Sequence, residues 1–220
     1  REVKRTLVVA ITSNRCLAGA FNTQVTRVVR RLAQEAGHEV HVLCVGKKAL
    51  DAFRRTPLNR PELPQDLAGL FDGLSFDKTA PVAELIMQRF TDGTYDRVML
   101  VYNRFKNAAT QVVTTEQFLP VLPASAPTDA KTATGEYIME PDRRTIVEEI
   151  IPKSLKIQLY KALLDSFAAE HGARMTAMHK ATDNADALLK DLKLSYNKAR
   201  QAAITGEILE IVGGAEALKG

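Results

Sequence analysis

Residues 173–211 read ARMTAMHKATDNADALLKDLKLSYNKARQAAITGEILEI, and the interpretation of the whole chain starts from them. They belong to a longer run, from Pro152 to Ile211, in which Gly172 and Gly206 alone interrupt residues that mostly favour helices. At 1.5 Å per residue, a helix of about 60 residues would be roughly 90 Å long. The sequence therefore predicts one helix that is much longer than a globular domain is wide.

A stripe of small and apolar side chains follows this predicted helix. Two series recur at seven-residue intervals: Met178, Ala185, Leu192 and Ala199, and Thr182, Leu189, Tyr196 and Ala203. Such a repeat is typical of a helix that packs closely along another helix. No other segment is long enough to pair with it, so we expect its mate on another chain or on a segment absent from this sequence. An exposed apolar end, residues 204–215, also calls for a partner.

The first 120 residues alternate between strand and helix patterns. Short apolar runs predict strands at 6–11, 39–45, 96–102 and 110–118, and helical patterns occupy 21–36, 47–54 and 81–91. This alternation predicts a three-layer, Rossmann-like α/β domain with a largely parallel sheet. The fourth strand is the most polar and is therefore expected near an edge. We predict an α/β domain at 1–135, a connecting segment at 136–151 and the long helix at 152–220.

Composition excludes several classes of protein. Apolar residues make up 45% of the 220 residues and charged residues 25%, which is ordinary for a globular protein and argues against disorder. No apolar run approaches the roughly 20 residues that span a bilayer. Two cysteines, Cys16 and Cys44, are too few for a disulfide scaffold. The net charge of +4 is compatible with an acidic partner.

No group of residues forms a convincing catalytic or metal site. Residues 13–22 lie between a strand and a helix, where phosphate-binding loops occur, but they contain one glycine and match neither nucleotide fingerprint. Cys44 lies in an apolar strand and Cys16 has no histidine nearby in sequence. A metal site from His171, His179 and Asp183 is weaker than the interpretation as surface side chains. We expect no catalytic residues, no cofactor and no metal.

Two alternatives remain open from the residues alone. One is a free-standing Rossmann-like enzyme that binds a phosphate or nucleotide at residues 13–22, although the long helix then has no role. The other is a nucleic-acid binder that uses the arginines of the first helices, although no aromatic platform accompanies them. These arginines are Arg27, Arg30, Arg31, Arg54 and Arg55.

Three segments resemble a known family over essentially the whole chain. They are TSNRCLAGAFN at 12–22, YIMEP at 137–141, and 174–208, which contains LSYNKARQAAITGEI. They are similar to the gamma subunits of bacterial-type F-type ATP synthases. The turn reads Cys16-Leu17-Ala18-Gly19 where the family usually has Gly-Leu-Cys-Gly, through divergence or an engineered thiol. The family's long N-terminal helix, which pairs with the C-terminal helix in an antiparallel coiled coil, is expected to be absent or removed here.

The resemblance implies a central-stalk rotor that is not catalytic in itself. Such a subunit turns inside a ring of alpha and beta subunits and couples transmembrane proton flow to ATP synthesis, or ATP hydrolysis to rotation. The implied partners are the alpha and beta subunits, the epsilon subunit, the membrane-embedded c-subunit ring and the N-terminal gamma helix if supplied, with no nucleic acid. The implied location is the cytoplasmic face of the inner (plasma) membrane, as a peripheral part of the complex. The choice between H⁺ and Na⁺ is made in the membrane ring.

The resemblance also assigns roles to residues, in three sets. A catch that contacts the beta subunits would consist of Arg200, Gln201, Thr205, Glu207 and Arg174. A bearing tip would consist of Ile204, Ile208, Ile211 and Val212. The contact with the membrane ring would involve Tyr137, Met139 and Glu140.

Overall fold

The computed structural model of this chain describes residues 2–121, 143–218 and 220. Its strands are β1 (Arg5–Ile11), β2 (Glu39–Val45), β3 (Arg97–Phe105) and β4 (Gln111–Leu119). Its helices are α1 (Phe21–Glu35), α2 (Lys47–Phe53), α3 (Phe76–Thr91) and α4 (Arg143–Ala217), with a short 3₁₀ turn, η1 (Ala68–Phe71). The chain divides into two compact units, unit 1 at 1–176 and unit 2 at 177–220, and α4 contributes to both.

The four strands form one sheet in the order β2-β1-β3-β4. β1 pairs in parallel with β2 and with β3, whereas β4 runs antiparallel to β3 at the edge of the sheet. The short connection between β3 and β4 requires this antiparallel pairing, because parallel neighbours need a long crossover. The predicted, largely parallel sheet is thus confirmed, with the polar fourth strand at an edge.

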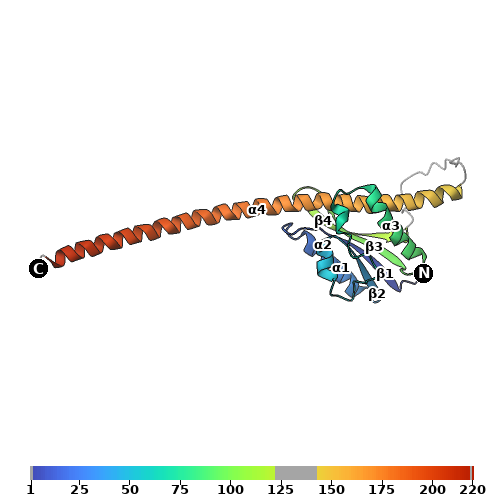
Figure 1. The fold of residues 1–220 in the computed structure, drawn as a ribbon, viewed down its shortest axis with the longest axis horizontal. Helices are drawn as coiled ribbons and strands as arrows, with labels where there is room; N and C mark the ends of the chain where they lie inside the picture. Colours follow the sequence, from blue (N-terminus) through green and yellow to red (C-terminus); the bar gives the residue numbers. More distant parts are fainter. Residues whose placement is uncertain (1, 122–142, 219) are drawn as a thin grey trace, which may run out of the picture. The chain divides into compact units, whose positions relative to one another are not determined.

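Helices cover both faces of the sheet and make unit 1 a three-layer domain (Figure 1). Side chains alternate between the faces along each strand. Val8, Ala10, Val42 and Cys44 pack with α1 and α2, whereas Leu7, Val9, Ile11 and Leu43 pack with α3 and the first part of α4. The predicted Rossmann-like layering is therefore confirmed.

The first part of α4 belongs to the core of unit 1. Leu155, Leu159, Ala162 and Leu163 recur at helical spacing, and each is at most 5% exposed. α4 begins at Arg143 and continues through Pro152, so the helix includes residues that the sequence placed in the connecting segment. The predicted division into an α/β domain, a connecting segment and a shaft helix is a division by role and stays a prediction.

Unit 2 is the remaining, C-terminal part of α4. From Met178 to Leu218 every residue is exposed except Gly206, which is partly covered. This helical stretch is roughly 60 Å long. Among the described residues, no helix is both long enough and apolar enough to span a membrane.

Candidate functional site

The predicted catch and bearing residues of unit 2 lie on one half of α4. Successive residues of a helix are about 100° apart, and from this geometry the eight side chains fall within an arc of about 160°. They are Arg200, Gln201, Ile204, Thr205, Glu207, Ile208, Ile211 and Val212. All are exposed, and Ile211 is 71% exposed. The helix therefore presents polar and branched apolar groups together on one surface.

The other half of the same helix carries mostly small residues. Ala199, Ala202, Ala203, Gly206 and Gly213 follow one another along it, with Glu210 as the charged exception. A Cβ atom added at Gly206 or Gly213 would meet nothing within 4 Å. A neighbouring helix could therefore approach this side of α4 closely.

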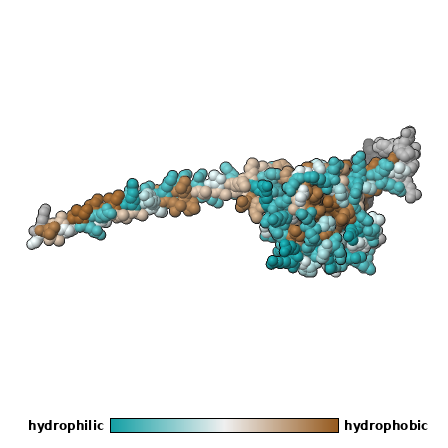
Figure 2. All heavy atoms as spheres, in the orientation of Figure 1, coloured by the Kyte–Doolittle hydropathy of each residue, from teal (hydrophilic) through white to brown (hydrophobic). Residues whose placement is uncertain are grey.

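Exposed apolar side chains gather at two places on unit 2, where Figure 2 shows the brown atoms. The first place holds Leu188, Leu189, Leu192 and Leu194, which are 50–60% exposed. The second is the predicted bearing tip, together with Leu209 at 66%. Soluble monomers rarely expose so many large apolar side chains in succession, so this helix has the surface of a subunit that works inside an assembly.

The remaining predicted contact residues are placed differently. Arg174 lies in unit 1, where its Nη2 donates to Glu170 Oε1 at 2.7 Å. The two side chains are 16% and 10% exposed, so the ion pair is largely shielded from water. Nη2 also lies 3.5 Å from the carbonyl oxygen of Cys16. The predicted membrane-ring residues Tyr137, Met139 and Glu140 lie outside the described residues.

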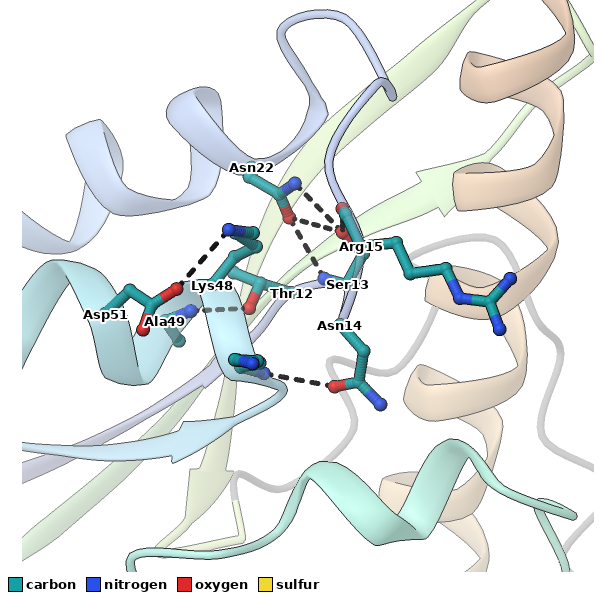
Figure 3. A network of polar contacts seen from close by, with 9 residues as sticks. Thr12, Ser13, Asn14, Arg15, Asn22, Lys48, Ala49 and Asp51 are labelled. Atoms are coloured by element: carbon teal, nitrogen blue, oxygen red, sulfur yellow. Dashed lines mark hydrogen bonds and ion pairs between the residues drawn. The ribbon is translucent and has the colours of Figure 1, made fainter.

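The turn after β1 is held by its own side chains (Figure 3). Asn22 Oδ1 accepts from the backbone N–H of Ser13 at 2.9 Å, and Ser13 Oγ donates to Arg15 O at 2.7 Å. Asn14 Nδ2 donates to the carbonyl of Ala68 at 2.8 Å. The polar side chains of this segment thus hold the turn and connect it to Ala68 of η1.

The same turn occupies the N-terminal amides of α2, which a phosphate would otherwise bind. Lys47 N donates to Asn14 Oδ1 at 3.0 Å, Lys48 N to Ser13 O at 3.1 Å, and Ala49 N to Thr12 Oγ1 at 2.8 Å. Gly46 permits this approach, because a Cβ atom there would lie 2.2 Å from Thr12 O. These three amides of α2 are therefore not available to an anion.

The other candidate groups do not form a site within the part of the chain that the structure describes. His171 packs edge-on against Phe167 with ring centroids 4.6 Å apart, and His179 Nε2 lies 3.9 Å from Asp183 Oδ2. No cluster of three or more metal-ligating side chains occurs among the described residues. Burial raises the pKa of the Cys44 thiol to about 12, which keeps it protonated and unreactive.

Among the local features that sequence reasoning missed is the neighbourhood of Cys16. Its thiol and, to a smaller degree, Asp51 raise the pKa of the Lys48 ammonium. Lys48 Nζ lies 3.3 Å from Asp51 Oδ2, an i, i+3 spacing that was visible in the sequence. Cys16 lies in the turn after β1, far from Lys48 in the sequence, so no sequence spacing indicates that the two residues meet.

Comparison with known proteins agrees with this arrangement. A family model described as ATP synthase matches residues 1–218. ATP synthase gamma chains from Flavobacterium psychrophilum and Flavobacterium johnsoniae are 57% and 55% identical over all of this chain and 75% of each relative. A mitochondrial ATP synthase central stalk and c-ring from Tetrahymena thermophila matches with a TM-score of 0.60 and 30% identity, over 83% of this chain and 78% of that chain. A mitochondrial ATP synthase from Euglena gracilis, described as OSCP, F1 and c-ring, shares the fold, with a TM-score of 0.64 and 24% identity, over 99% of this chain and 73% of that chain.

Proposed function

This chain belongs to the ATP synthase gamma family, and on that premise we propose how its surfaces couple rotation to ATP chemistry. The chain is a central-stalk rotor subunit of a membrane-associated ATP synthase and is not itself catalytic. This membership replaces the alternative of a free-standing Rossmann-like enzyme. The observation that carries the proposal is the row of exposed side chains from Met178 to Ala217 on one continuous helix.

The exposed helix of unit 2 would turn inside a ring of alpha and beta subunits. A rotor biases otherwise equivalent sites only as far as its contacts differ in free energy from one orientation to the next. α4 meets this requirement because its two halves differ: one carries Arg200, Gln201 and Glu207, and the other mostly alanine and glycine. Each beta subunit would therefore meet a different surface at each angle.

The polar residues Arg200, Gln201, Thr205 and Glu207 would act as an intermittent catch. Charge-assisted hydrogen bonds to carboxylates or carbonyls depend on geometry, so they form in one orientation and break in the next. The exposed state of these four side chains leaves them free to make such contacts. Arg174 is a less direct candidate for this role, because its guanidinium is already bound to Glu170.

The tip residues Ile204, Ile208, Ile211 and Val212 would act as the bearing. Apolar contact is non-directional and therefore has little preference for one angle over another. The small-residue side of unit 2 would receive the N-terminal gamma helix of the family, since small side chains let two helix backbones approach closely.

The remaining partners follow from the family role. We propose that unit 1 rests on the membrane ring beside the epsilon subunit, with the ring contact around Tyr137, Met139 and Glu140, on the cytoplasmic face of the membrane. One elementary charge that crosses about 100 mV supplies roughly 2.3 kcal/mol, so several ion steps must be summed for one ATP. A stiff helix can accumulate the torque of those steps, whereas a flexible loop would not.

The test is a double substitution in the assembled ATP synthase. We expect Arg200→Ala with Gln201→Ala to lower ATP turnover by about tenfold, because two polar contacts of the catch are lost. Unit 1 should stay folded, since both residues lie in the exposed helix of unit 2. Turnover is measured as ATP hydrolysis by the purified complex, with subunit composition checked on the same sample.

The matched control is Lys190→Ala with Lys193→Ala. Both lysines are exposed on the same helix, about two to three turns before the catch. Their loss should leave turnover unchanged. Wild-type turnover in the Arg200 and Gln201 variant, or an equal loss in the lysine variant, would show that no specific catch exists at these residues.

A further inference from the structure

Two loops of unit 1 contact α4 at the end of its buried stretch, and we call this set of contacts the collar. The first loop is the turn after β1 and the second is the connection between β3 and β4. The collar consists of Ala18, Phe21, Ala108, Ala169, Glu170, Gly172, Ala173, Arg174 and Thr176. Apart from Arg174, the less direct catch candidate, the rotor function proposed above did not use these residues.

The β3–β4 connection touches the backbone of α4 directly. A Cβ atom at Gly172 would lie 3.1 Å from Ala108 O and 3.2 Å from Ala108 Cα, so a larger residue there would have to push the loop away. One turn later, the Thr176 hydroxyl lies 3.1 Å from Ala108 O and 3.0 Å from Gly172 O. A single loop carbonyl is therefore held between a glycine and a hydroxyl of the helix.

The turn after β1 contacts α4 elsewhere around its circumference. Ala18 and Phe21 form a buried cluster with Ala169 and Ala173, all at most 8% exposed. Beside this cluster, Arg174 binds Glu170 and reaches toward the carbonyl of Cys16. An apolar contact and a shielded ion pair thus complement the contact at Ala108.

Together these contacts surround more than half of the helix. From Gly172 to Arg174, the collar positions of α4 span an arc of about 200° around its axis. A rotation of the helix about its axis would break the Gly172–Ala108 contact, the alanine cluster or the ion pair. Beyond Thr176 none of the described side chains of α4 is buried. A torque applied to unit 2 therefore reaches the collar before any other contact of unit 1.

We propose that the collar is the joint through which torque passes between unit 1 and the rotating helix. Its members act as positioning residues for the rotor, because they act through the helix that they hold. Backbone contact at Gly172 and the directional bonds of Arg174 and Thr176 resist twisting at the end of the buried stretch that lies nearest to unit 2. The apolar packing near Leu159 adds resistance earlier along the helix, because rotation would expose its buried side chains. The proposal rests on the rotor function of the family.

The test measures the torsional stiffness of the rotor in the complete ATP synthase. The ring of alpha and beta subunits is fixed to a surface, and a probe is attached to unit 1 through Cys16. The angular fluctuations of the probe are then recorded while the rotor is not turning. We expect Thr176→Val to broaden the angular distribution, because the hydroxyl that binds Ala108 O is replaced by a methyl group of similar size. Gly172→Val should broaden it further, and Thr176→Ser should restore the wild-type width.

Two substitutions serve as matched controls. The Thr91 hydroxyl in α3 donates to Met87 O within its own helix, so Thr91→Val removes a comparable bond outside the collar. A Cβ atom at Gly69 meets nothing within 4 Å, so Gly69→Ala adds a side chain without displacing a loop. Neither should change the angular distribution. The conservative Thr176→Val variant keeps the test valid if Gly172→Val fails to assemble.

Three outcomes would overturn the proposal. In the first, Thr176→Val and assembled Gly172→Val show the wild-type width. In the second, Thr91→Val broadens the distribution as much as Thr176→Val does. In the third, the probe on the wild-type enzyme does not rotate during ATP hydrolysis. This outcome would refute the rotor function and, with it, the role of the collar. The first two leave the rotor function intact, so the two failures are distinguishable.

Discussion

Two stretches of the same helix meet opposite environments in this protein. Residues 155–173 of α4 bury one side against the sheet, and Leu159 is 1% exposed. Residues 178–217 have no such cover, and Leu189 on the same helix is 50% exposed. The backbone hydrogen bonding is alike in both stretches, so the difference lies in the side chains. The first stretch is a structural element of a domain, and the second is a surface for other subunits.

The largest expected contrast between the two stretches is a pair of leucine truncations. Leu159→Ala should lower the free energy of unfolding of unit 1 by about 3 kcal/mol, because it leaves a cavity in the core. Leu189→Ala should change it by less than about 0.5 kcal/mol, because its side chain is largely in water. Urea unfolding of the chain followed by circular dichroism gives both values. Equal losses would mean that the two stretches are not distinct.

A pair of arginines gives the next contrast. Arg174→Ala leaves the Glu170 carboxylate without its ion pair and should cost about 2 kcal/mol, between the values for buried and exposed pairs. Arg200→Ala should cost nothing measurable in the isolated chain, because its side chain is exposed. Adding Glu170→Gln to Arg174→Ala should recover part of the loss. A stable Arg174→Ala variant would show that the shielded pair contributes little.

Alkaline pH should destabilise unit 1 through Tyr102. Burial, followed by the hydrogen bond to Glu116 and the charge of that residue, raises the pKa of Tyr102 above its usual value of 10.0. The folded state therefore favours the neutral phenol, and this stability is full below pH 10 and decreases as the pH rises above it, by at most about 1.4 kcal/mol per pH unit. Tyr102→Phe should flatten the alkaline decrease, measured by urea midpoints between pH 9 and 11.5.

The matched change in unit 2 is Tyr196→Phe. The Tyr196 ring is 69% exposed, so its removal should leave the alkaline decrease as steep as in the wild type. A flatter curve for Tyr196→Phe, or an unchanged curve for Tyr102→Phe, would show that the loss of stability at alkaline pH does not come from the burial of Tyr102.

The smallest expected contrast concerns two glycines. Gly206→Ala should stabilise the helix of unit 2 by about 0.5–1 kcal/mol, because alanine favours helices and its Cβ meets nothing within 4 Å. Gly37→Ala should instead destabilise unit 1 by about 1 kcal/mol, because Gly37 has a φ of +62°. Hydrogen exchange of the surrounding amides measures both. Faster exchange in the Gly206→Ala variant would contradict the expected gain.

Much of the sheet domain was predictable from local patterns. The second strand was expected at 39–45 and is found there, and the first, third and fourth strands differ from their predicted bounds by a few residues. α3 begins at Phe76 and not at residue 81, because Ser75 caps it and accepts a hydrogen bond from Lys78 N. The sequence rule that places proline in the first turn of a helix moved the predicted start to Pro81.

The dual environment of α4 was not predictable in the same way. A run of helix-forming residues predicts the helix, but the same alternation of leucine and alanine serves for packing on a sheet and for packing on another helix. The seven-residue stripe begins at Met178, and it does not indicate that Leu155 to Ala173, earlier on the same helix, pack within unit 1. The tertiary contact decides between these uses, and local sequence does not contain it.

The candidate site was also predictable only in part. The catch and bearing residues came from the family resemblance, and helix geometry then brings those of unit 2 onto one side of α4. The collar was missed because its loop residue, Ala108, has no distinctive chemistry. Two signals pointed to it: the i, i+4 pair of Glu170 and Arg174, and a glycine, Gly172, inside a helix.

The packing of α4 on the sheet also constrains how the protein can be made. The apolar face formed by Leu7, Val9 and Leu43 is closed partly by Leu159 and Leu163, which are more than 110 residues later in the chain. A ribosome therefore exposes half of this core throughout most of synthesis, and contacts over such sequence distances form slowly. A chain that stops before Leu163 would keep that face open and aggregate, so a premature stop discards the sheet domain along with the helix.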